Sequence, residues 1–316
     1  MVPRRCHTNQ VSRPAIVAVV GATASGKTGL SLDLAERLGG EVVNTDAMQV
    51  YRGMDIGTAK LPVAERRGIP HHLLDLLDVT ESATVAAFQQ QARTVIAELR
   101  GRGVTPVLVG GSALYTRAVL DRFDFPGTDE TVRQRWEAEL DRVGARALYD
   151  VLAQRDPEAA AGMLPENGRR TVRALEVIEL TGRPYSASLP VLEYVDPRTV
   201  QIGVDIDRAE LDRRIESRVD AMFDGGLVDE VRRLMDLGLE RGRTASRAIG
   251  YSEVVAHLHG QTTEDAAREA TKARTRRFAR RQDGWFRKDP RVVWVRHDDP
   301  SRWERALAAL PGHHST

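Results

Sequence analysis

The fold of this chain is decided by the stretch Gly21-Ala22-Thr23-Ala24-Ser25-Gly26-Lys27-Thr28. It matches the phosphate-loop pattern G-x-x-x-x-G-K-[ST], and it lies between an apolar run at 15–20 and a helical apolar pattern at 30–38. Close turns at the glycines let backbone N–H groups converge on a phosphate chain at the start of a helix. We therefore expect every residue from Gly21 to Thr28 to bind a diphosphate group. The Lys27 ammonium would contact the terminal phosphate, and the Thr28 hydroxyl would be a ligand of Mg²⁺. The alternative interpretation is a glycine-rich turn that binds no ligand.

Length and composition limit the class of protein and the number of domains. A chain of 316 residues with 41% hydrophobic content is long enough for two domains and an ordinary core. The net charge of +1 gives no global sign of nucleic-acid binding, so any basic surface must be local. The single cysteine, Cys6, excludes an internal disulfide framework and is typical of a reducing cytoplasm. Residues 1–13 are expected to form a flexible tail, and the apolar run after them is too short to span a membrane. We expect a cytoplasmic monomer that does not bind membranes.

Strand and helix patterns alternate before residue 120 and again after residue 199. After the first strand, further strands are expected at 41–45, 105–109, 199–204 and 292–295. Such alternation predicts a parallel sheet whose ligands gather at the carboxyl ends of the strands. We expect an α/β fold with a P-loop NTPase-like catalytic core and a helical C-terminal region. This core would comprise residues 14–120 and 199–316.

Residues 121–198 show a different pattern. Helical stretches at 130–143, 146–154 and 169–180 are separated by glycine and proline breaks, and no convincing strand interrupts them. We interpret this part of the chain as a helical insertion within the α/β core.

Polar residues follow two of the expected strands, where a parallel sheet gathers its ligands. Asp46 comes after the second strand, where a carboxylate can act as a base or as an outer partner of Mg²⁺; a turn-capping residue is the alternative. Ser112 comes after the third strand and faces the same crevice, or else it caps the helix expected at 113–120. His71 and His72 point to opposite sides of an extended segment, which makes them poor joint metal ligands. We interpret both histidines as structural.

Further runs extend the pattern beyond the phosphate loop. In chain order, the runs are G-A-T-A-S-G-K-T, N-T-D-A-M-Q-V-Y-R-G-M-D-I-G-T-A-K, P-H-H-L-L-D, P-V-L-V-G-G-S-A-L-Y, R-R-T-V-R-A-L-E-V, R-R-I-E-S-R-V-D-A-M, A-I-G-Y-S-E and T-R-R-F-A-R-R-Q-D-G-W-F-R. Together they resemble the tRNA dimethylallyltransferases, also called tRNA isopentenyltransferases or IPP transferases, over residues 15–290. The segment 46–60 is the most specific, because generic phosphate-loop kinases do not carry it. The chain departs from the commonest family pattern at Ala22, where proline is usual, at Ala47, where serine is usual, and at Ser112, where threonine is usual. The serine hydroxyl is therefore absent at position 47, whereas Ser112 keeps a hydroxyl.

The resemblance implies a prenyltransferase that uses dimethylallyl diphosphate as donor and Mg²⁺ as cofactor. Its acceptor is N6 of the adenosine 3′-adjacent to the anticodon in tRNAs, and its products are N6-isopentenyladenosine and diphosphate. The exocyclic amine of adenine is a weak nucleophile, so the resemblance makes Asp46 the general base, with Ser112 beside the adenine. Lys27, the loop N–H groups and Mg²⁺ on Thr28 would stabilise the departing diphosphate.

An arginine would complete the diphosphate site. By resemblance it is Arg218, with Arg214 one helical turn earlier as a second possibility. The alternative for Arg218 is a surface ion pair with a neighbouring carboxylate, Glu216 or Asp220.

The resemblance also implies binding of the tRNA anticodon stem-loop, whose modified base must leave its stack. The residues expected to contact tRNA are Asp46, Ala47, Met48, Gln49, Ser112, Arg133, Arg169, Arg170, Arg173, Arg276 and Arg280. These arginines belong to two basic clusters, one in the helical insertion and one in the C-terminal helical region, where aromatic residues are interleaved. Basic helices with aromatic residues suit phosphate contact and base stacking, and a solvated basic face is the alternative.

Two other classes of protein share part of the pattern. A small-molecule kinase or other nucleoside triphosphatase would share the phosphate loop, but it would carry an acid at the end of the third strand. Here that strand ends in Val109-Gly110-Gly111-Ser112. A non-catalytic RNA-binding protein with a relic loop would not need Lys27, Thr28 and Asp46, which are all present.

Overall fold

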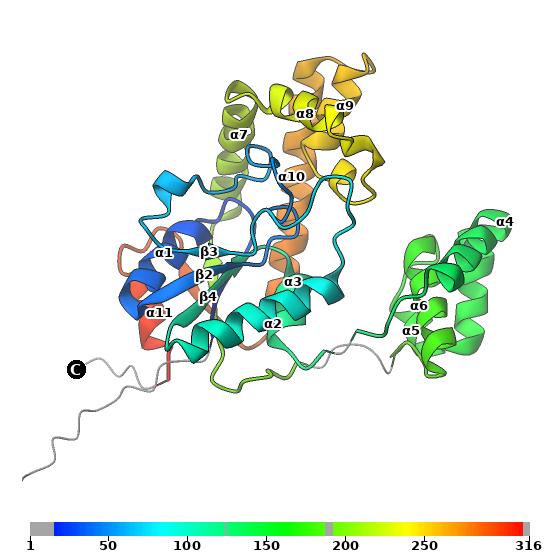
Figure 1. Cartoon of the computed structure of the whole chain (residues 1–316), viewed down its shortest axis with the longest axis horizontal. Coiled ribbons are helices and arrows are strands. Elements are labelled where there is room, and N and C mark those ends of the chain that lie inside the picture. Colours follow the sequence, from blue (N-terminus) through cyan, green and yellow to red (C-terminus); the bar gives the residue numbers. More distant parts are fainter. Residues whose placement is uncertain (1–15, 124, 187–191, 312–316) are drawn as a thin grey trace, which may run out of the picture. The chain divides into compact units, whose positions relative to one another are not determined.

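The computed structural model describes residues 16–123, 125–186 and 192–311 of the chain (Figure 1). The tail expected at 1–13, with Cys6, lies outside these residues. None of the helices within the described ranges has the length and apolar composition that a membrane crossing needs.

The chain divides into two compact units. The first combines Met1–Leu120 with Tyr194–Thr316, and the second is Asp121–Glu193. The second unit therefore ends earlier than the insertion expected at 121–198.

The first unit is built on a six-stranded sheet with the order β3-β2-β4-β1-β5-β6. The strands are β1 Val17–Val20, β2 Gly40–Asn44, β3 His71–His72, β4 Thr105–Gly110, β5 Val200–Asp205 and β6 Val292–Arg296. Every residue of β1 is buried, as expected of a strand that is apolar on both faces, and Val20 lies opposite Gly110 on one side and Gly203 on the other. All neighbouring strands are parallel, so the ends of β1, β2 and β4 meet at one edge of the sheet. This confirms the predicted α/β fold class.

One face of the sheet is covered by α1 (Lys27–Leu38) and α11 (Arg302–Ala308). Their buried side chains form one cluster with Val17, Val19 and Val107. The first of these helices ends at Gly39, whose left-handed backbone (φ 57°) suits a residue without a side chain.

A second set of helices lies on the other side of the sheet, and their buried side chains belong to one cluster with Ala18, Val20 and Val43. These helices are α2 Val85–Gly101, α3 Ala113–Leu120, α7 Arg208–Asp224, α8 Leu227–Asp236, α9 Tyr251–Leu258 and α10 Glu264–Phe286. Short 3₁₀ turns lie at Val63–Glu65, Leu239–Arg241 and Ala245–Arg247. Figure 1 shows α10 beside α7, with α8 and α9 at the end of this pair away from the sheet.

The helix α7 follows the pattern expected from its sequence. Asp207 caps its first turn by accepting hydrogen bonds from two backbone N–H groups. Its buried face is formed by Leu211, Ile215, Val219 and Phe223. This packing fixes the helix against the core and holds its arginines on a rigid support.

The second unit is helical. It contains α4 Glu130–Arg155, α5 Pro157–Ala161 and α6 Gly168–Thr181 around a core that includes Leu148 and Leu175. Within α4, Gly144 has a non-helical backbone (φ 82°, ψ 164°), so the long element is two helices joined at a kink.

Candidate active site

The phosphate-loop sequence forms a loop between β1 and the start of α1. Gly26 stands at the N-cap of α1 with a left-handed backbone (φ 98°), which side-chain-bearing residues rarely adopt. The Lys27 ammonium folds back over the loop and donates a hydrogen bond of 2.6 Å to the carbonyl of Ala22. The loop is thus closed around its own lysine, at the end of a helix whose dipole favours a bound anion.

Two cavities meet beside this loop. The smaller has a volume of about 80 Å³, and the larger has a volume of about 860 Å³. The lining residues common to both are Thr23, Asp46, Thr58, Ala59 and Arg218. A ligand in the smaller cavity and a ligand in the larger one would therefore come together at Asp46.

The smaller cavity has a cationic wall. It is lined by Lys27 and Arg218, together with the carboxylate of Asp46. The pKa of the Lys27 ammonium is lowered to about 8, mainly by burial, then by the nearby Arg218 charge, while Asp46 acts in the opposite direction. Burial, followed by the charge of Arg214, also lowers the pKa of the Arg218 guanidinium. The cations of this wall thus disfavour one another's charged forms, and an anionic ligand would relieve this.

Arg218 is free to face the ligand. Among the described residues it forms no ion pair, because the two carboxylates proposed as alternative partners are engaged elsewhere. Glu216 pairs with Arg276 at 2.7 Å, and Asp220 pairs with Lys272 at 2.7 Å. The second candidate, Arg214, pairs with Glu210 at 2.7 Å, which leaves Arg218 as the better placed of the two.

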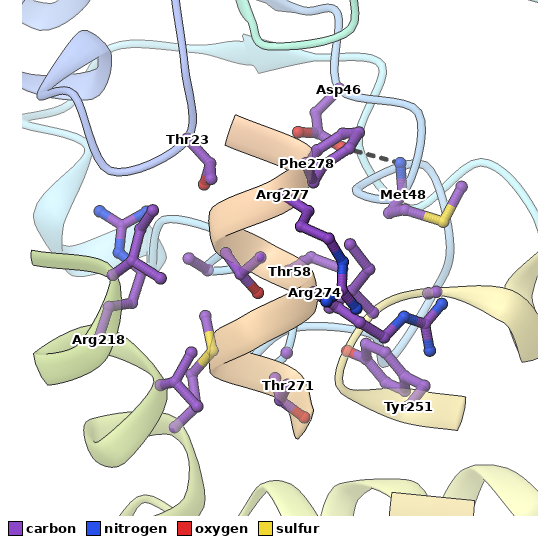
Figure 2. A pocket seen from close by; sticks show the side chains of 18 of the residues that line it. Thr23, Asp46, Met48, Thr58, Arg218, Tyr251, Thr271, Arg274, Arg277 and Phe278 are labelled. Atoms are coloured by element: carbon purple, nitrogen blue, oxygen red, sulfur yellow. Dashed lines mark hydrogen bonds between the residues drawn. The ribbon is translucent and has the colours of Figure 1, made fainter. Parts of the chain in front are cut away.

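Asp46 lies in the turn after β2. Its carboxylate accepts a hydrogen bond of 2.9 Å from the backbone N–H of Met48, which is the dashed line in Figure 2. Burial raises the pKa of the Asp46 carboxyl, whereas the Met48 hydrogen bond, the Lys27 charge and the Gln49 backbone lower it. A carboxylate that is partly desolvated in this way is a stronger proton acceptor than an exposed one.

Ser112 connects β4 to this turn. Its hydroxyl accepts a hydrogen bond of 3.3 Å from the N–H of Ala47, the residue after Asp46. Its backbone carbonyl accepts the Thr116 N–H at 2.9 Å, as at the start of a helix. The side chain therefore faces the turn and the larger cavity and does not cap α3.

The remaining residues of the turn line the cavities. Ala47 and Met48 face the larger one, and Gln49 faces the smaller one. The amide of Gln49 also donates a hydrogen bond of 3.1 Å to the carbonyl of Thr58. The turn and the segment around Thr58 are thus joined at the meeting point of the cavities.

Sequence reasoning missed the groups that hold the segment 46–60 in place. Glu230 on α8 is buried and accepts hydrogen bonds from the backbone N–H groups of Asp55, Ile56 and Gly57. It also accepts the hydroxyl hydrogen of Tyr251 at 2.6 Å. These contacts explain why the segment keeps a fixed path to the cavities. Nothing local in the sequence around Glu230 indicates its partners.

Lys60 anchors the other end of the same segment. Its buried ammonium forms ion pairs of 2.6 Å with both Asp55 and Asp75. It also donates a hydrogen bond of 2.9 Å to the carbonyl of Tyr51. All its partners are local carboxylates or carbonyls, so the role of this lysine is to fix the segment.

The adjacent histidines have different surroundings. His72 pairs with Glu41 at 2.6 Å, as expected of a structural residue. His71 lines the smaller cavity, and its Nδ1 is 2.8 Å from the carbonyl of Ile69. Burial lowers the pKa of the His71 imidazole, with smaller contributions from Arg66 and His72. His71 therefore belongs to the wall of the site, which its sequence context did not reveal.

The helix α10 supplies arginines to the larger cavity. Figure 2 shows Arg274, Arg277 and Phe278 on this helix, and Arg280 also lines the cavity. Arg276 points elsewhere, because it pairs with Glu216 on α7 and is not part of the lining. Of the two α10 residues predicted to contact tRNA, Arg280 therefore lines the cavity and Arg276 does not.

The arginines of the second unit fall into two groups. Arg133 and Arg173 pair with the buried carboxylate of Glu176 at 2.7 and 2.9 Å, so both contribute to the packing of this unit. Arg169 and Arg170 are exposed at the start of α6, and neither forms an ion pair within the described part of the chain. The latter two are the more available for contact with a polyanion.

A metal ion would depend on the ligand for most of its coordination. The described residues contain no group of three or more His, Cys, Asp or Glu side chains arranged to hold a metal. Thr28 lines the smaller cavity near Asn44 and Asp46. Mg²⁺ usually keeps several waters and binds through substrate phosphates with one or two protein oxygens. This set of oxygens therefore fits Mg²⁺ bound between Thr28 and a diphosphate.

Comparison with known proteins identifies the family. The family model for IPP transferase matches residues 49–289. The chain belongs to the IPP transferase family. This confirms the resemblance inferred from the sequence.

Members of this family with curated names are similar over nearly the whole chain. A tRNA dimethylallyltransferase of Nocardioides sp. is 70% identical over 299 residues, which cover 95% of this chain and 96% of that protein. A tRNA dimethylallyltransferase of Streptomyces griseus subsp. griseus is 56% identical over 303 residues, which cover 96% of this chain and 97% of that protein.

Solved structures of the family have the same architecture. The full-length tRNA isopentenylpyrophosphate transferase of Bacillus halodurans superposes with a TM-score of 0.67 at 43% identity, covering 92% of this chain and 94% of that one. A eukaryotic dimethylallyltransferase, described as acting on tRNA, gives a TM-score of 0.80 at 27% identity, and the match covers 93% of this chain and 77% of that one.

Proposed function

We propose that this protein transfers the dimethylallyl group of dimethylallyl diphosphate to N6 of the adenosine 3′-adjacent to the anticodon in tRNAs. The products are N6-isopentenyladenosine and diphosphate. The observation that carries the proposal is the meeting of two cavities at Asp46, one lined by Lys27 and Arg218 and the other lined by arginines of α10. The names of the two curated family members described above, which are 70% and 56% identical to this chain, support the same activity.

The donor would bind through its diphosphate at the phosphate loop. The loop N–H groups and the ammonium of Lys27 would hold the terminal phosphate, and Arg218 would neutralise charge that builds up on the leaving group. To reach the phosphate, Lys27 would exchange its hydrogen bond with the Ala22 carbonyl for one with the ligand. Mg²⁺, held between Thr28 and the diphosphate, would supply additional charge neutralisation there.

The acceptor adenine would enter through the larger cavity, after leaving its stack in the anticodon loop. As the nitrogen N6 attacks the allylic carbon, the bond from that carbon to the diphosphate oxygen breaks. Asp46 takes the proton that N6 loses, and the Ser112 hydroxyl accepts the second N6 hydrogen. Together, the two oxygens would orient the amine toward the donor.

The tRNA would be held by arginines on both units. Arg280 in the cavity and the exposed pair Arg169 and Arg170 are the strongest candidates among the predicted residues. Phosphate contacts of this kind give affinity that weakens with salt. The chain itself supplies each group in the proposed chemistry, so we propose a monomer, acting in the cytoplasm, where a lone cysteine stays reduced.

Competition calorimetry tests the proposed donor against the kinase alternative. Dimethylallyl diphosphate should bind, and inorganic diphosphate should displace it, because both use the cationic wall around Lys27. A kinase would prefer ATP to both ligands. Tight binding of ATP with no detectable binding of the allylic diphosphate would contradict the proposed function.

A further inference from the structure

A single side chain connects the two halves of the proposed site. Gln282 lies on α10 and is almost fully buried, with 5% of its surface exposed. Its carbonyl oxygen accepts a hydrogen bond of 2.8 Å from the backbone N–H of Thr23 in the phosphate loop. Its amide nitrogen donates a hydrogen bond of 2.9 Å to the backbone carbonyl of Gly111 at the end of β4.

These contacts continue toward the proposed base. Gly111 is followed by Ser112. The Ser112 hydroxyl accepts a hydrogen bond of 3.3 Å from the N–H of Ala47, the residue after Asp46. A Cβ atom at Gly111 would lie 2.3 Å from the Gln282 nitrogen, so a side chain there would displace the amide. The donor loop and the acceptor groups are therefore linked through Gln282 by these hydrogen bonds and by the backbone that joins Gly111 to Ser112 and Asp46 to Ala47.

The chemistry of the side chain suits this position. Gln282 satisfies a backbone donor and a backbone acceptor at once, which needs an amide that carries both functions. Glutamate would accept from Thr23 but would set its charge against the Gly111 carbonyl, and lysine or arginine would have no acceptor. An apolar replacement would leave the Thr23 N–H and the buried Gly111 carbonyl without these partners.

We propose that Gln282 is a positioning residue, which sets the distance between the donor loop and the groups that hold the acceptor. This inference rests on the proposed function. It predicts that loss of the amide misaligns N6 with the allylic carbon while both substrates still bind.

Misalignment has a chemical consequence that is separate from a loss of rate. In the normal reaction the carbon–oxygen bond to diphosphate breaks, the carbon–nitrogen bond forms, and Asp46 receives the proton. When N6 is displaced, water can attack the same carbon, which gives dimethylallyl alcohol, diphosphate and a proton. The ratio of alcohol to prenylated RNA therefore reports on positioning.

The experiment measures this ratio in Gln282→Met under single-turnover conditions, with saturating radiolabelled donor and an unmodified anticodon stem-loop. The matched control is Gln201→Met, since Gln201 is also a buried glutamine with two partners, Tyr194 and Asp289, neither of which belongs to the phosphate loop or to the turn after β2. We expect transfer in Gln282→Met to slow by about 10- to 100-fold and the alcohol ratio to rise by about tenfold. Gln201→Met should keep the ratio of the unaltered protein.

A second variant covers the case in which Gln282→Met does not fold. Gln282→Glu keeps the contact with Thr23 and loses the donor to Gly111, so it should raise the alcohol ratio in the same direction. A variant that only lowers the fraction of folded protein would reduce both products equally. An unchanged ratio in a folded Gln282 variant would overturn the inference. Failure of the unaltered protein to prenylate the stem-loop would instead contradict the proposed function, and the inference with it.

Discussion

Donor binding should weaken as the pH rises through the range in which Lys27 loses its proton. Burial and the charge of Arg218 lower the pKa of Lys27 from 10.5 to about 8, while Asp46 partly opposes the shift. Only the ammonium form attracts diphosphate, so affinity is retained below this pKa and lost above it. A group with a pKa near 8 is about 90% protonated at pH 7 and about 10% protonated at pH 9. We therefore expect the affinity for inorganic diphosphate to fall by about tenfold between these two pH values.

The assay is calorimetric titration with inorganic diphosphate across this pH range. Diphosphate itself titrates, so the control is Lys27→Arg, whose guanidinium keeps its charge throughout. The pH dependence of each protein is compared with its own value at pH 7, which removes any difference in absolute affinity. Equal pH dependence in the two proteins would refute the assignment of Lys27 as the titrating contact.

Replacing two neighbours of Lys27 should shift the pH at which diphosphate affinity is lost, in opposite directions. Arg218→Gln removes a charge that lowers the Lys27 pKa, so the loss of affinity should move to higher pH. Asp46→Asn removes a charge that raises this pKa, so the loss should move to lower pH. Shifts in the same direction would contradict the arrangement of charges around the loop.

Three further predictions concern the acceptor side. Asp46→Asn should slow single-turnover transfer by about 100-fold or more with diphosphate binding at pH 7 largely kept, and near-normal transfer would remove Asp46 from the mechanism. Ser112→Ala should slow the chemical step by about 10- to 100-fold while Ser112→Thr stays close to the unaltered rate, and a fully active alanine variant would limit Ser112 to its contact with the turn. Paired replacement of Arg169 and Arg170 by glutamine should weaken tRNA binding and flatten its salt dependence without changing the melting temperature of the protein. The control Arg173→Gln should lower the melting temperature, and an unchanged salt slope in the paired variant would exclude the pair from the RNA contact.

The elements of the core could be predicted because their signals are local. The apolar run before the phosphate loop became β1, and the expected strands at 105–109 and 292–295 became β4 and β6. The break at Gly144 between two expected helices appears as the kink inside α4. These segments carry their own periodicity and their own glycine stops, so neighbours in space are not needed to recognise them.

The contacts that complete the site could not be predicted, because they join distant parts of the chain. Gln282 lies 259 residues from Thr23, and Glu230 lies 174 residues from Ile56. A carboxylate on an amphipathic helix is interpreted as part of the exposed face until its buried partners are known. The structural role of Arg173 was missed for the same reason. In the sequence it is one basic residue among several, and only the structure shows its ion pair with the buried Glu176.

The central claim is tested most directly by identifying the product. The purified protein is incubated with Mg²⁺, dimethylallyl diphosphate and an unmodified tRNA transcript, and the nucleosides are then analysed by mass spectrometry. A transcript with guanosine in place of the adenosine 3′ to the anticodon serves as the control. We expect N6-isopentenyladenosine from the first transcript and none from the second, with Asp46→Asn strongly reduced. Release of diphosphate without any prenylated adenosine, or prenylation that persists in the guanosine transcript, would contradict the account.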